Sequence, residues 1–376
     1  MAASRTGADP RAATARPGGD GAAPEDGAHP RRRSPWRAVV RAAVSFAVVA
    51  GIFYGLLRDT DLAEVGRALA DMTTLELAGL LAVTLWNTVT YWLVLQSALP
   101  GLTLRQAAIS STTSTAVANT VPGGAAFGVV TTSAMYSSWG VPGPAIARAV
   151  VVTGVWNTFV KLGMPVLALA ILAVTDEAGA GLVTAAFAGV AVLAVAVVVF
   201  ALMLRSDALA GRVGHVLTTV ANRGLRVVRR GPVADWGAAA VRFRRDTIGL
   251  LRHKWVPLTV TTLVSHVSLY VVLLVALRDV GVSEHEVSWA EVLGAFAFVR
   301  LLTALPITPG GVGVVELGLT AALVVAGGDQ AQVVAAVLVF RGLTYLLPVP
   351  FGALTYLLWR REGHPARGRS PGPARR

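Results

Sequence analysis

The sequence contains no cysteine and few charged residues. None of its 376 residues is cysteine, which excludes disulfide bonds, thiol catalysis and cysteine-based metal sites. Charged residues make up 14% of the chain, whereas soluble domains carry about 25%. Hydrophobic residues make up 54%, and several apolar runs reach about 20 residues, enough to cross a bilayer as a helix. The composition therefore predicts an all-α polytopic membrane protein.

Six apolar runs have transmembrane length. They cover 38–57, 75–98, 148–174, 181–204, 255–277 and 331–359. Two further apolar stretches, 104–138 and 289–326, are each interrupted by Pro-Gly-Gly. Each side of a break would form a helix of roughly 20–27 Å, slightly short for a hydrocarbon core of about 30 Å. The sequence leaves open whether these are paired short crossings or re-entrant hairpins, and we expect about eight transmembrane segments in all.

The tails differ in composition from the membrane domain, which we expect over 38–359. Residues 1–37 are rich in Ala, Gly, Pro and Arg and nearly lack large apolar side chains. Such a segment cannot bury enough surface to fold, and the same disorder is expected of the basic tail 360–376. The apolar run 38–57 is too long for a typical signal peptide and no small-residue cleavage site follows, so we interpret it as an uncleaved first span.

Basic residues concentrate in three places, which explains the net charge of +12. The first tail has seven Arg, the segment 205–254 has ten Arg plus Lys254, and the last tail has six Arg, whereas 58–74 has two and 278–288 has one. Because cytoplasmic segments are enriched in Lys and Arg, both termini and 205–254 are predicted to be cytoplasmic, in a multi-pass protein of the cell membrane. Nucleic acid is not expected as a partner.

The segment 205–254 is predicted to form two amphipathic helices joined at "RRGPVADW". An apolar face would be shared by Leu209, Val213, Val216, Leu217 and Val220. A basic amphipathic helix of this kind would lie on the anionic inner leaflet. The alternative is a solvated connector whose charges serve only to set the topology.

Two halves of the chain resemble each other. "ANTVPGGAAFGVV" (118–130) is similar to "LPITPGGVGVVEL" (305–317), and matching segments lie upstream and downstream in the same order. The predicted topology gives the two copies opposite orientations, with the span 181–204 between them. Inverted repeats with discontinuous helices are typical of transporters, and their substrate sites lie at the repeat interface.

Four charged residues fall within apolar runs: Lys161, Arg300, Glu316 and Arg341. A charge at the bilayer centre costs at least about 2.5–3.5 kcal/mol, so such residues are usually paired and functional. If they converge, Glu316 neutralises one cation and the others still require an anion, such as a lipid phosphate. Their polar companions at membrane depth are His266, Asn87, Asn119 and Asn157.

The two breaks are candidate anion sites. Helices that restart at about Gly124 and Gly311 would present free N–H groups and a positive dipole end. Glycines at such places let the backbone approach a ligand closely. The candidate substrate-binding residues at the breaks are Asn119, Pro122, Gly123, Gly124, Pro309, Gly310, Gly311 and Gly313.

Each candidate has a purely structural alternative. Lys161 could extend its ammonium to the membrane interface, and Arg300 and Arg341 could form a structural pair with Glu316. The prolines could only kink helices, and the Asn and His side chains could only bond neighbouring helices.

The layout, "LPITPGGVGVVE" and "FRGLTYLLPVPFGAL" resemble the lysylphosphatidylglycerol synthase transmembrane region family, also described as flippase-like membrane proteins. The resemblance covers roughly 38–360, and the second Pro-Gly-Gly with Glu316 and Arg341 carries most of it. The first copy, "PGGAAFGVV", departs because it has no acidic residue. In bifunctional members of the family, a soluble aminoacyltransferase domain follows the membrane part. We expect no such domain here, so the resemblance implies the translocation module without the synthase.

We therefore expect a flippase-like transporter that moves a phosphate-bearing lipid, with or without an aminoacyl group, between leaflets. One rival is an ion- or proton-coupled transporter of a small anion, and another is a non-transporting membrane scaffold. A lipid-modifying enzyme would need a convergent acid/base set, and only Glu316 and His266 offer themselves. No enzyme activity, cofactor or metal is expected.

Overall fold

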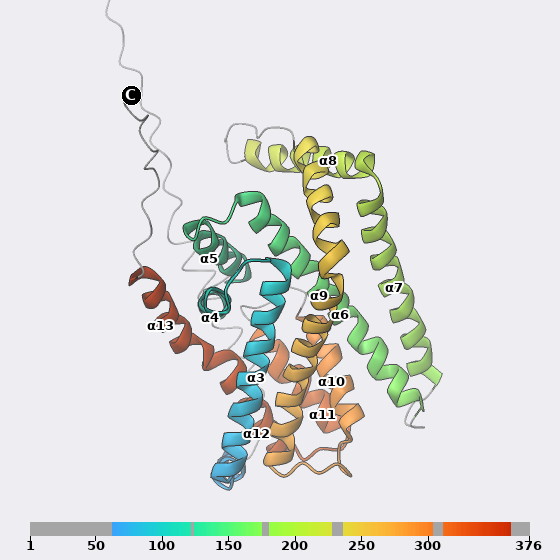
Figure 1. The fold of residues 1–376 in the computed structure, drawn as a ribbon. Coiled ribbons are helices and arrows are strands. Elements are labelled where there is room, and N and C mark those ends of the chain that lie inside the picture. The colour runs from blue at the N-terminus through green and yellow to red at the C-terminus, as the bar shows by residue number, and fades with distance from the viewer. Residues whose placement is uncertain (1–61, 122–123, 175–179, 228–235, 304–310, 362–376) are drawn as a thin grey trace, which may run out of the picture. The chain divides into compact units, whose positions relative to one another are not determined.

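The structure is a computed structural model of the chain, and it describes residues 62–121, 124–174, 180–227, 236–303 and 311–361. Within these ranges every regular element is a helix and no strand occurs, which confirms the all-α prediction (Figure 1). The expected first span 38–57 lies outside the described residues, as do the tail 1–37 and residues 362–376 of the last tail.

Four helical segments are long and apolar enough to cross a membrane. They are α3 (Thr74–Ala98), α6 (Gly143–Val174), α9 (Gly237–Asp279) and the segment Gln330–Arg361, which consists of α12 (Gln330–Arg341), the π-helical turn η2 (Gly342–Leu346) and α13 (Pro348–Arg361). A fifth is gained if α7 (Ala180–Arg205) and the helix that follows it count as one bent span. The expected count of about eight is not confirmed by the described residues.

The two interrupted stretches form pairs of short helices. The first gives α4 (Leu104–Thr120) and α5 (Gly124–Ser138), and the second gives α10 (Trp289–Leu302) and α11 (Val314–Val325). Their lengths of 17, 15, 14 and 12 residues correspond to about 18–26 Å, less than a hydrocarbon core of about 30 Å. This shortness is the reason why they do not count as separate full spans.

The first pair is a close-packed antiparallel hairpin. A Cβ on Gly124 would lie 2.1 Å from the carbonyl oxygen of Ala118, and one on Gly128 would lie 3.0 Å from that of Ser114. The later residue of α5, Gly128, thus contacts the earlier residue of α4, Ser114, which shows that the chain reverses direction at the break. Gly124 is therefore required by the packing of α5 on α4, whereas the sequence had suggested close approach to a ligand.

The basic segment contains two helices, as expected, but the second is continuous with a span. The first helix is α8 (Asp207–Val227). The second is the beginning of α9, a helix of 43 residues whose first 18 residues belong to the basic segment. The axis turns by 97° between the end of α7 and α8. Arg244 and Arg245 on α9 pair with Asp207 at 2.5 and 3.1 Å, which fastens the start of α8 to α9.

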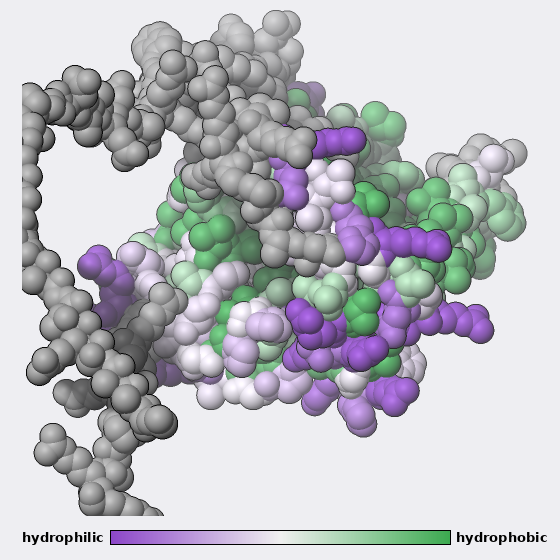
Figure 2. Space-filling model, turned by 90° about the horizontal axis from the view of Figure 1, so that it is seen from above, coloured by the Kyte–Doolittle hydropathy of each residue, from purple (hydrophilic) through white to green (hydrophobic). Residues whose placement is uncertain are grey.

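Apolar side chains are exposed along the helices of the membrane domain. On α7, Phe187, Val195 and Val198 are 72%, 62% and 54% exposed. A water-exposed surface of this kind would be costly, whereas lipid tails cover it without loss. Figure 2 looks down on the end of the molecule where α8 lies and shows hydrophilic side chains gathered there beside apolar ones.

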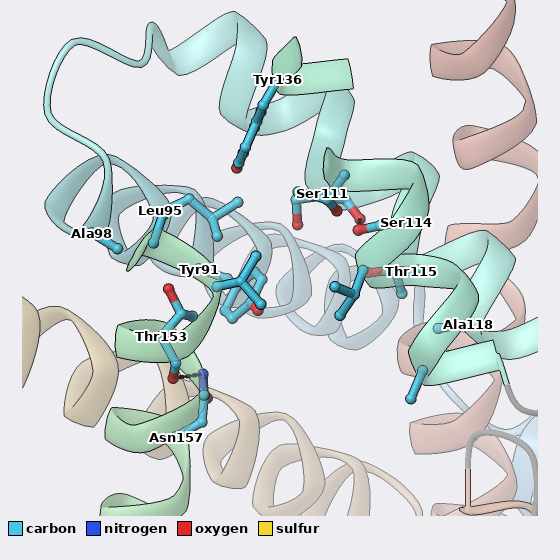
Figure 3. A pocket seen from close by; sticks show the side chains of 17 residues that line it. Tyr91, Leu95, Ala98, Ser111, Ser114, Thr115, Ala118, Tyr136, Thr153 and Asn157 are labelled. Carbon is cyan, nitrogen blue, oxygen red and sulfur yellow. Dashed lines mark hydrogen bonds between the residues drawn. The ribbon is translucent and has the colours of Figure 1, made fainter. Parts of the chain in front are cut away.

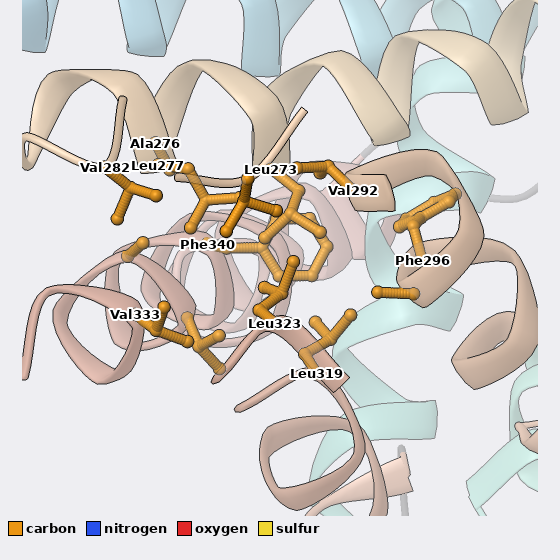
Figure 4. Packing of buried hydrophobic residues seen from close by; sticks show 14 of the residues in the cluster. Leu273, Ala276, Leu277, Val282, Val292, Phe296, Leu319, Leu323, Val333 and Phe340 are labelled. Atoms are coloured by element: carbon orange, nitrogen blue, oxygen red, sulfur yellow. The ribbon is translucent and has the colours of Figure 1, made fainter. Parts of the chain in front are cut away.

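The largest buried cluster joins the second half of α9 to α10, α11 and α12. Figure 4 shows the side chains that interlock there, among them Leu273, Phe296, Leu319, Leu323 and Phe340. Close packing of this kind fixes the positions of the attached residues. Phe340 and Leu319 therefore hold in place the neighbouring charged residues Arg341 and Glu316.

Three long-range helix contacts complete the arrangement. Helix α3 packs along α9, where the Asn87 side chain donates to the Ser265 carbonyl at 2.8 Å and to Ser268 Oγ at 2.9 Å. Helix α4 packs along α13, and α10 packs along α6. A Cβ on Gly352 of α13 would lie 2.2 Å from the Ala116 Cβ on α4, so this crossing depends on glycine.

Candidate functional site

The second break positions Glu316 at the start of α11. Gly311 and Gly313 have φ angles of 70° and 84°, a left-handed conformation that favours glycine. Helix α11 then begins at Val314, and the Glu316 side chain folds back so that Oε2 accepts the Gly313 N–H at 2.7 Å. Glu316 therefore satisfies a free donor of its own helix. Pro309 and Gly310 of the same break lie outside the described residues, as do Pro122 and Gly123 of the first.

Glu316 also forms a buried ion pair with Arg341 at the end of α12. Arg341 Nε donates to Glu316 Oε1 at 2.7 Å, and the two side chains are 12% and 4% exposed. The structural pairing considered for Arg341 is therefore present. Both carboxylate oxygens of Glu316 therefore accept a hydrogen bond, and Arg341 balances the negative charge.

A chain of contacts runs from this pair to the first break. The Arg341 guanidinium lies over the Tyr345 ring at 4.3 Å. The Tyr345 hydroxyl donates to the Asn119 carbonyl at 2.5 Å, and the Asn119 side chain donates to the Tyr345 carbonyl at 2.9 Å. Asn119 is in the last turn of α4. The polar residues of the two breaks are thus bridged through the π-helical turn η2, a distortion that often occurs at functional sites.

Arg300, in the last turn of α10, has no such partner. Its Nε is buried and makes no hydrogen bond among the described residues. Arg300 lies within electrostatic range of Arg341, Lys161, His266 and Tyr91. The structure therefore brings three of the predicted cations and His266 into one region of the membrane domain.

Lys161 of α6 is likewise without an ion pair or a side-chain hydrogen bond in the described ranges. His266 is 4% exposed; its Nδ1 contacts the Thr262 carbonyl at 3.0 Å, and its Nε2 has no partner among the described residues. Glu316 is the carboxylate that the sequence predicts near these groups, and it already forms an ion pair with Arg341. Among the described residues the region therefore has an excess of positive charge that an anion would balance.

The other predicted polar residues have structural partners. Asn87 bonds α3 to α9, and Asn119 bonds α4 to η2, as described above. Asn157 donates to the Thr153 carbonyl of its own helix at 2.8 Å. No group of three or more His, Asp or Glu side chains stands together to hold a metal ion within the part of the chain that the structure describes.

Sequence reasoning missed a pocket of about 290 Å³ between α3, α4, α5 and α6. Its wall is rich in hydroxyl groups, including those of Tyr91, Ser111, Thr115, Tyr136 and Thr153, which face a common space in Figure 3. The signal that could have revealed it is "SSTTST" (110–115), a run of hydroxyl side chains in a helix that is otherwise expected to face lipid or apolar neighbours.

The family model for the lysylphosphatidylglycerol synthase transmembrane (TM) region matches residues 42–352. The chain belongs to this family. The match covers most of the sequence and includes both breaks, Lys161, Arg300, Glu316 and Arg341. No individual curated protein matches the chain. This member of the lysylphosphatidylglycerol synthase TM family is thus a membrane protein with a cluster of partly buried cations and a neighbouring hydroxyl-lined pocket.

Proposed function

We propose that the protein is a lipid flippase-like transporter that moves a phosphate-bearing lipid between the leaflets of the cell membrane. The observation that carries the proposal is Arg300, which is partly buried, with a fully buried Nε, lies near Lys161 and Arg341, and has no ion-pair partner among the described residues. A buried cation without a counter-charge is costly. A phosphate group that enters this region would supply the missing charge and accept several charge-assisted hydrogen bonds.

Reciprocal packing of the two halves supports an inverted repeat. The leading helix of the first broken pair, α4, packs on α13, the final segment of the second half. Equivalently, α10, the leading helix of the second pair, packs on α6, the final span of the first half. The two helices that begin the halves, α3 and α9, pack on each other. This exchange is the pattern that a pseudo-two-fold axis between the halves would produce.

Such an arrangement suits alternating access. The cation region lies where both halves contribute, because Lys161 belongs to the first half and Arg300, Glu316 and Arg341 belong to the second. Rocking of one half against the other would open the same residues to either side of the membrane. The lipid tails would remain in the bilayer while the headgroup passes the cations.

The orientation proposed for this mechanism has both termini in the cytoplasm, with α8 on the inner leaflet. Val216 and Val220 of α8 are 60% and 59% exposed. The sharp turn between α7 and α8 is what an interfacial helix requires, because it redirects the chain from the membrane normal to the membrane plane.

A reconstitution experiment tests the proposal against its rivals. Purified protein in liposomes is supplied with fluorescent lipids that carry phosphate headgroups, with fluorescent diacylglycerol as the headgroup-free control, and with radiolabelled inorganic phosphate in the lumen. Leaflet exchange of the phosphate lipids above that in empty liposomes, with no release of phosphate, supports the lipid transporter. Release of phosphate without lipid exchange supports the small-anion transporter. Neither activity, with the appropriate ion gradients supplied, supports the scaffold.

A further inference from the structure

The hydroxyl-lined pocket has a wall without charge. Its volume of about 290 Å³ is at the lower end of the range of about 300–1,000 Å³ that small-molecule pockets occupy. Among the described residues, no Asp, Glu, Lys, Arg or His lines it. Asn157 and several aliphatic and glycine residues provide the rest of the lining, and the small volume suits one compact group.

Five hydroxyl groups of this wall are not used by the fold, whereas Ser114 donates to the Ser111 carbonyl and Tyr136 accepts from Ser110. Those of Tyr91, Ser111, Thr115, Thr132 and Thr153 make no hydrogen bond to another described residue. Elsewhere in the same helices, hydroxyls are satisfied by the preceding turn: Thr131 donates to the Phe127 carbonyl and Thr158 to the Gly154 carbonyl, each at 2.9 Å. In apolar surroundings a polar group without a partner costs free energy. The five pocket hydroxyls are therefore available to a ligand that both donates and accepts hydrogen bonds.

The pocket adjoins the cation region along two helices. On α6, Thr153 and Asn157 line the pocket, and Lys161 follows four residues later on the same face, about 6 Å further along the axis. On α3, Tyr91 lines the pocket and lies within electrostatic range of Arg300. One ligand could therefore place a phosphate at the cations and an uncharged group in the pocket.

We infer that this pocket binds an uncharged, polyhydroxylated group, such as a sugar or cyclitol ring, carried next to the phosphate that the proposed function places at Arg300. A ring of this class offers many hydroxyl donors and acceptors, and its C–H faces can lie against the rings of Tyr91 and Tyr136. An ammonium headgroup fits less well, because the described part of the pocket lining offers no carboxylate to pair with it. The inference rests on the proposed function and narrows its substrate.

Lipid retention measures the headgroup preference directly. The full chain in nanodiscs is offered phosphatidylinositol and phosphatidic acid with identical acyl chains, and the retained lipids are counted by native mass spectrometry. Thr132→Val and Thr153→Val remove pocket hydroxyls. Thr131→Val and Thr158→Val are matched controls on the same helices, because their hydroxyls are bonded to backbone and do not line the pocket.

We expect wild type to retain phosphatidylinositol in preference to phosphatidic acid. Combining Thr132→Val and Thr153→Val should lower phosphatidylinositol retention about thirtyfold, since two hydrogen bonds of about 1 kcal/mol each are lost, with phosphatidic acid retention unchanged. The control pair should keep the preference. Unchanged phosphatidic acid retention also reports that the pocket variant is folded. If the pocket variant instead lowers retention of both lipids equally, the inference is overturned.

Two further outcomes separate this inference from the proposed function, and a competition with free myo-inositol identifies the source of the bound group. Equal retention of both lipids by wild type, lost in Arg300→Gln, overturns the pocket inference and leaves the phosphate site standing. Retention of neither lipid overturns both. If free myo-inositol displaces phosphatidylinositol, the pocket binds the same kind of ring as a soluble ligand. If the lipid stays bound, the ring that the pocket binds is the headgroup of a lipid.

Discussion

Arg341 Nε donates to Glu316 Oε1 at 2.7 Å, while Glu316 Oε2 accepts the N–H of Gly313 at the same distance. One carboxylate thus ties the end of α12 to the start of α11. Loss of one partner of a buried pair leaves an uncompensated charge and costs about 3–5 kcal/mol, whereas replacing both partners can be nearly neutral.

We therefore predict that Glu316→Gln and Arg341→Met each lower the thermal unfolding midpoint in detergent. The destabilisation of the double variant should be smaller than the sum of the destabilisations of the two single variants, because the double variant retains no unpaired charge at either position. Differential scanning fluorimetry of the four proteins measures this coupling. Strictly additive midpoint shifts would show that the two side chains do not depend on each other.

The link between the two breaks gives a second prediction. Tyr345→Phe removes the hydroxyl that bonds the Asn119 carbonyl but keeps the ring beneath Arg341. We expect a loss of about 0.5–1.5 kcal/mol in stability together with slower lipid exchange in liposomes. Tyr356→Phe on α13 is the matched control, since the Tyr356 hydroxyl makes no hydrogen bond to a described residue. Equal effects of the two substitutions would contradict the proposed link.

The crossing of α4 and α13 gives a third prediction. Gly352→Ala would place a Cβ 2.2 Å from that of Ala116 and 2.6 Å from the Thr112 carbonyl oxygen. Overpacking of this kind costs about 1–3 kcal/mol. Gly79→Ala in α3 meets no atom within 4 Å and should be neutral or stabilising, because alanine favours the helix. Unfolding midpoints of the two variants should therefore shift in opposite directions or differ clearly in size. A midpoint for Gly352→Ala equal to that of wild type would mean that the helices do not cross this closely.

The placement of α8 gives a fourth prediction. Because the sequence has no cysteine, a single introduced cysteine can be labelled without background. A fluorophore on Val216→Cys should be quenched by nitroxide lipids, and one on the adjacent His215→Cys should be quenched mainly by aqueous iodide. Equal iodide quenching at both positions would favour the solvated connector over the interfacial helix.

Hydropathy located the long helices because each must bury about 20 apolar residues in lipid. The expected 75–98 and 181–204, for example, correspond closely to α3 and α7. Charge at membrane depth likewise singled out Glu316 and Arg300. The first span, both Pro-Gly dipeptides of the breaks and most of the tails lie outside the described residues, so those predictions stand as predictions.

The remainder depended on contacts between distant residues. Asn119 and Tyr345 are separated by 226 positions, and no local pattern indicates that they bond. The hydroxyl pocket was missed for a similar reason. Thr131 and Thr132 look alike in sequence, yet one hydroxyl bonds its own helix and the other faces the pocket. The direction of each side chain is set by how α4, α5 and α6 pack, which the sequence pattern alone does not provide.

If Arg300 receives a lipid phosphate, its removal must slow the movement of the simplest phosphate lipid between leaflets. Wild type, Arg300→Gln and Arg360→Gln are reconstituted at equal density, and the rate at which fluorescent phosphatidic acid leaves the outer leaflet is measured. Arg360 is an exposed residue at the end of α13 and serves as the matched control. Loss of a charge-assisted hydrogen bond of about 1.5–3 kcal/mol predicts exchange at least tenfold slower in Arg300→Gln and unchanged in Arg360→Gln. Exchange in Arg300→Gln at the wild-type rate would mean that Arg300 does not bind the phosphate.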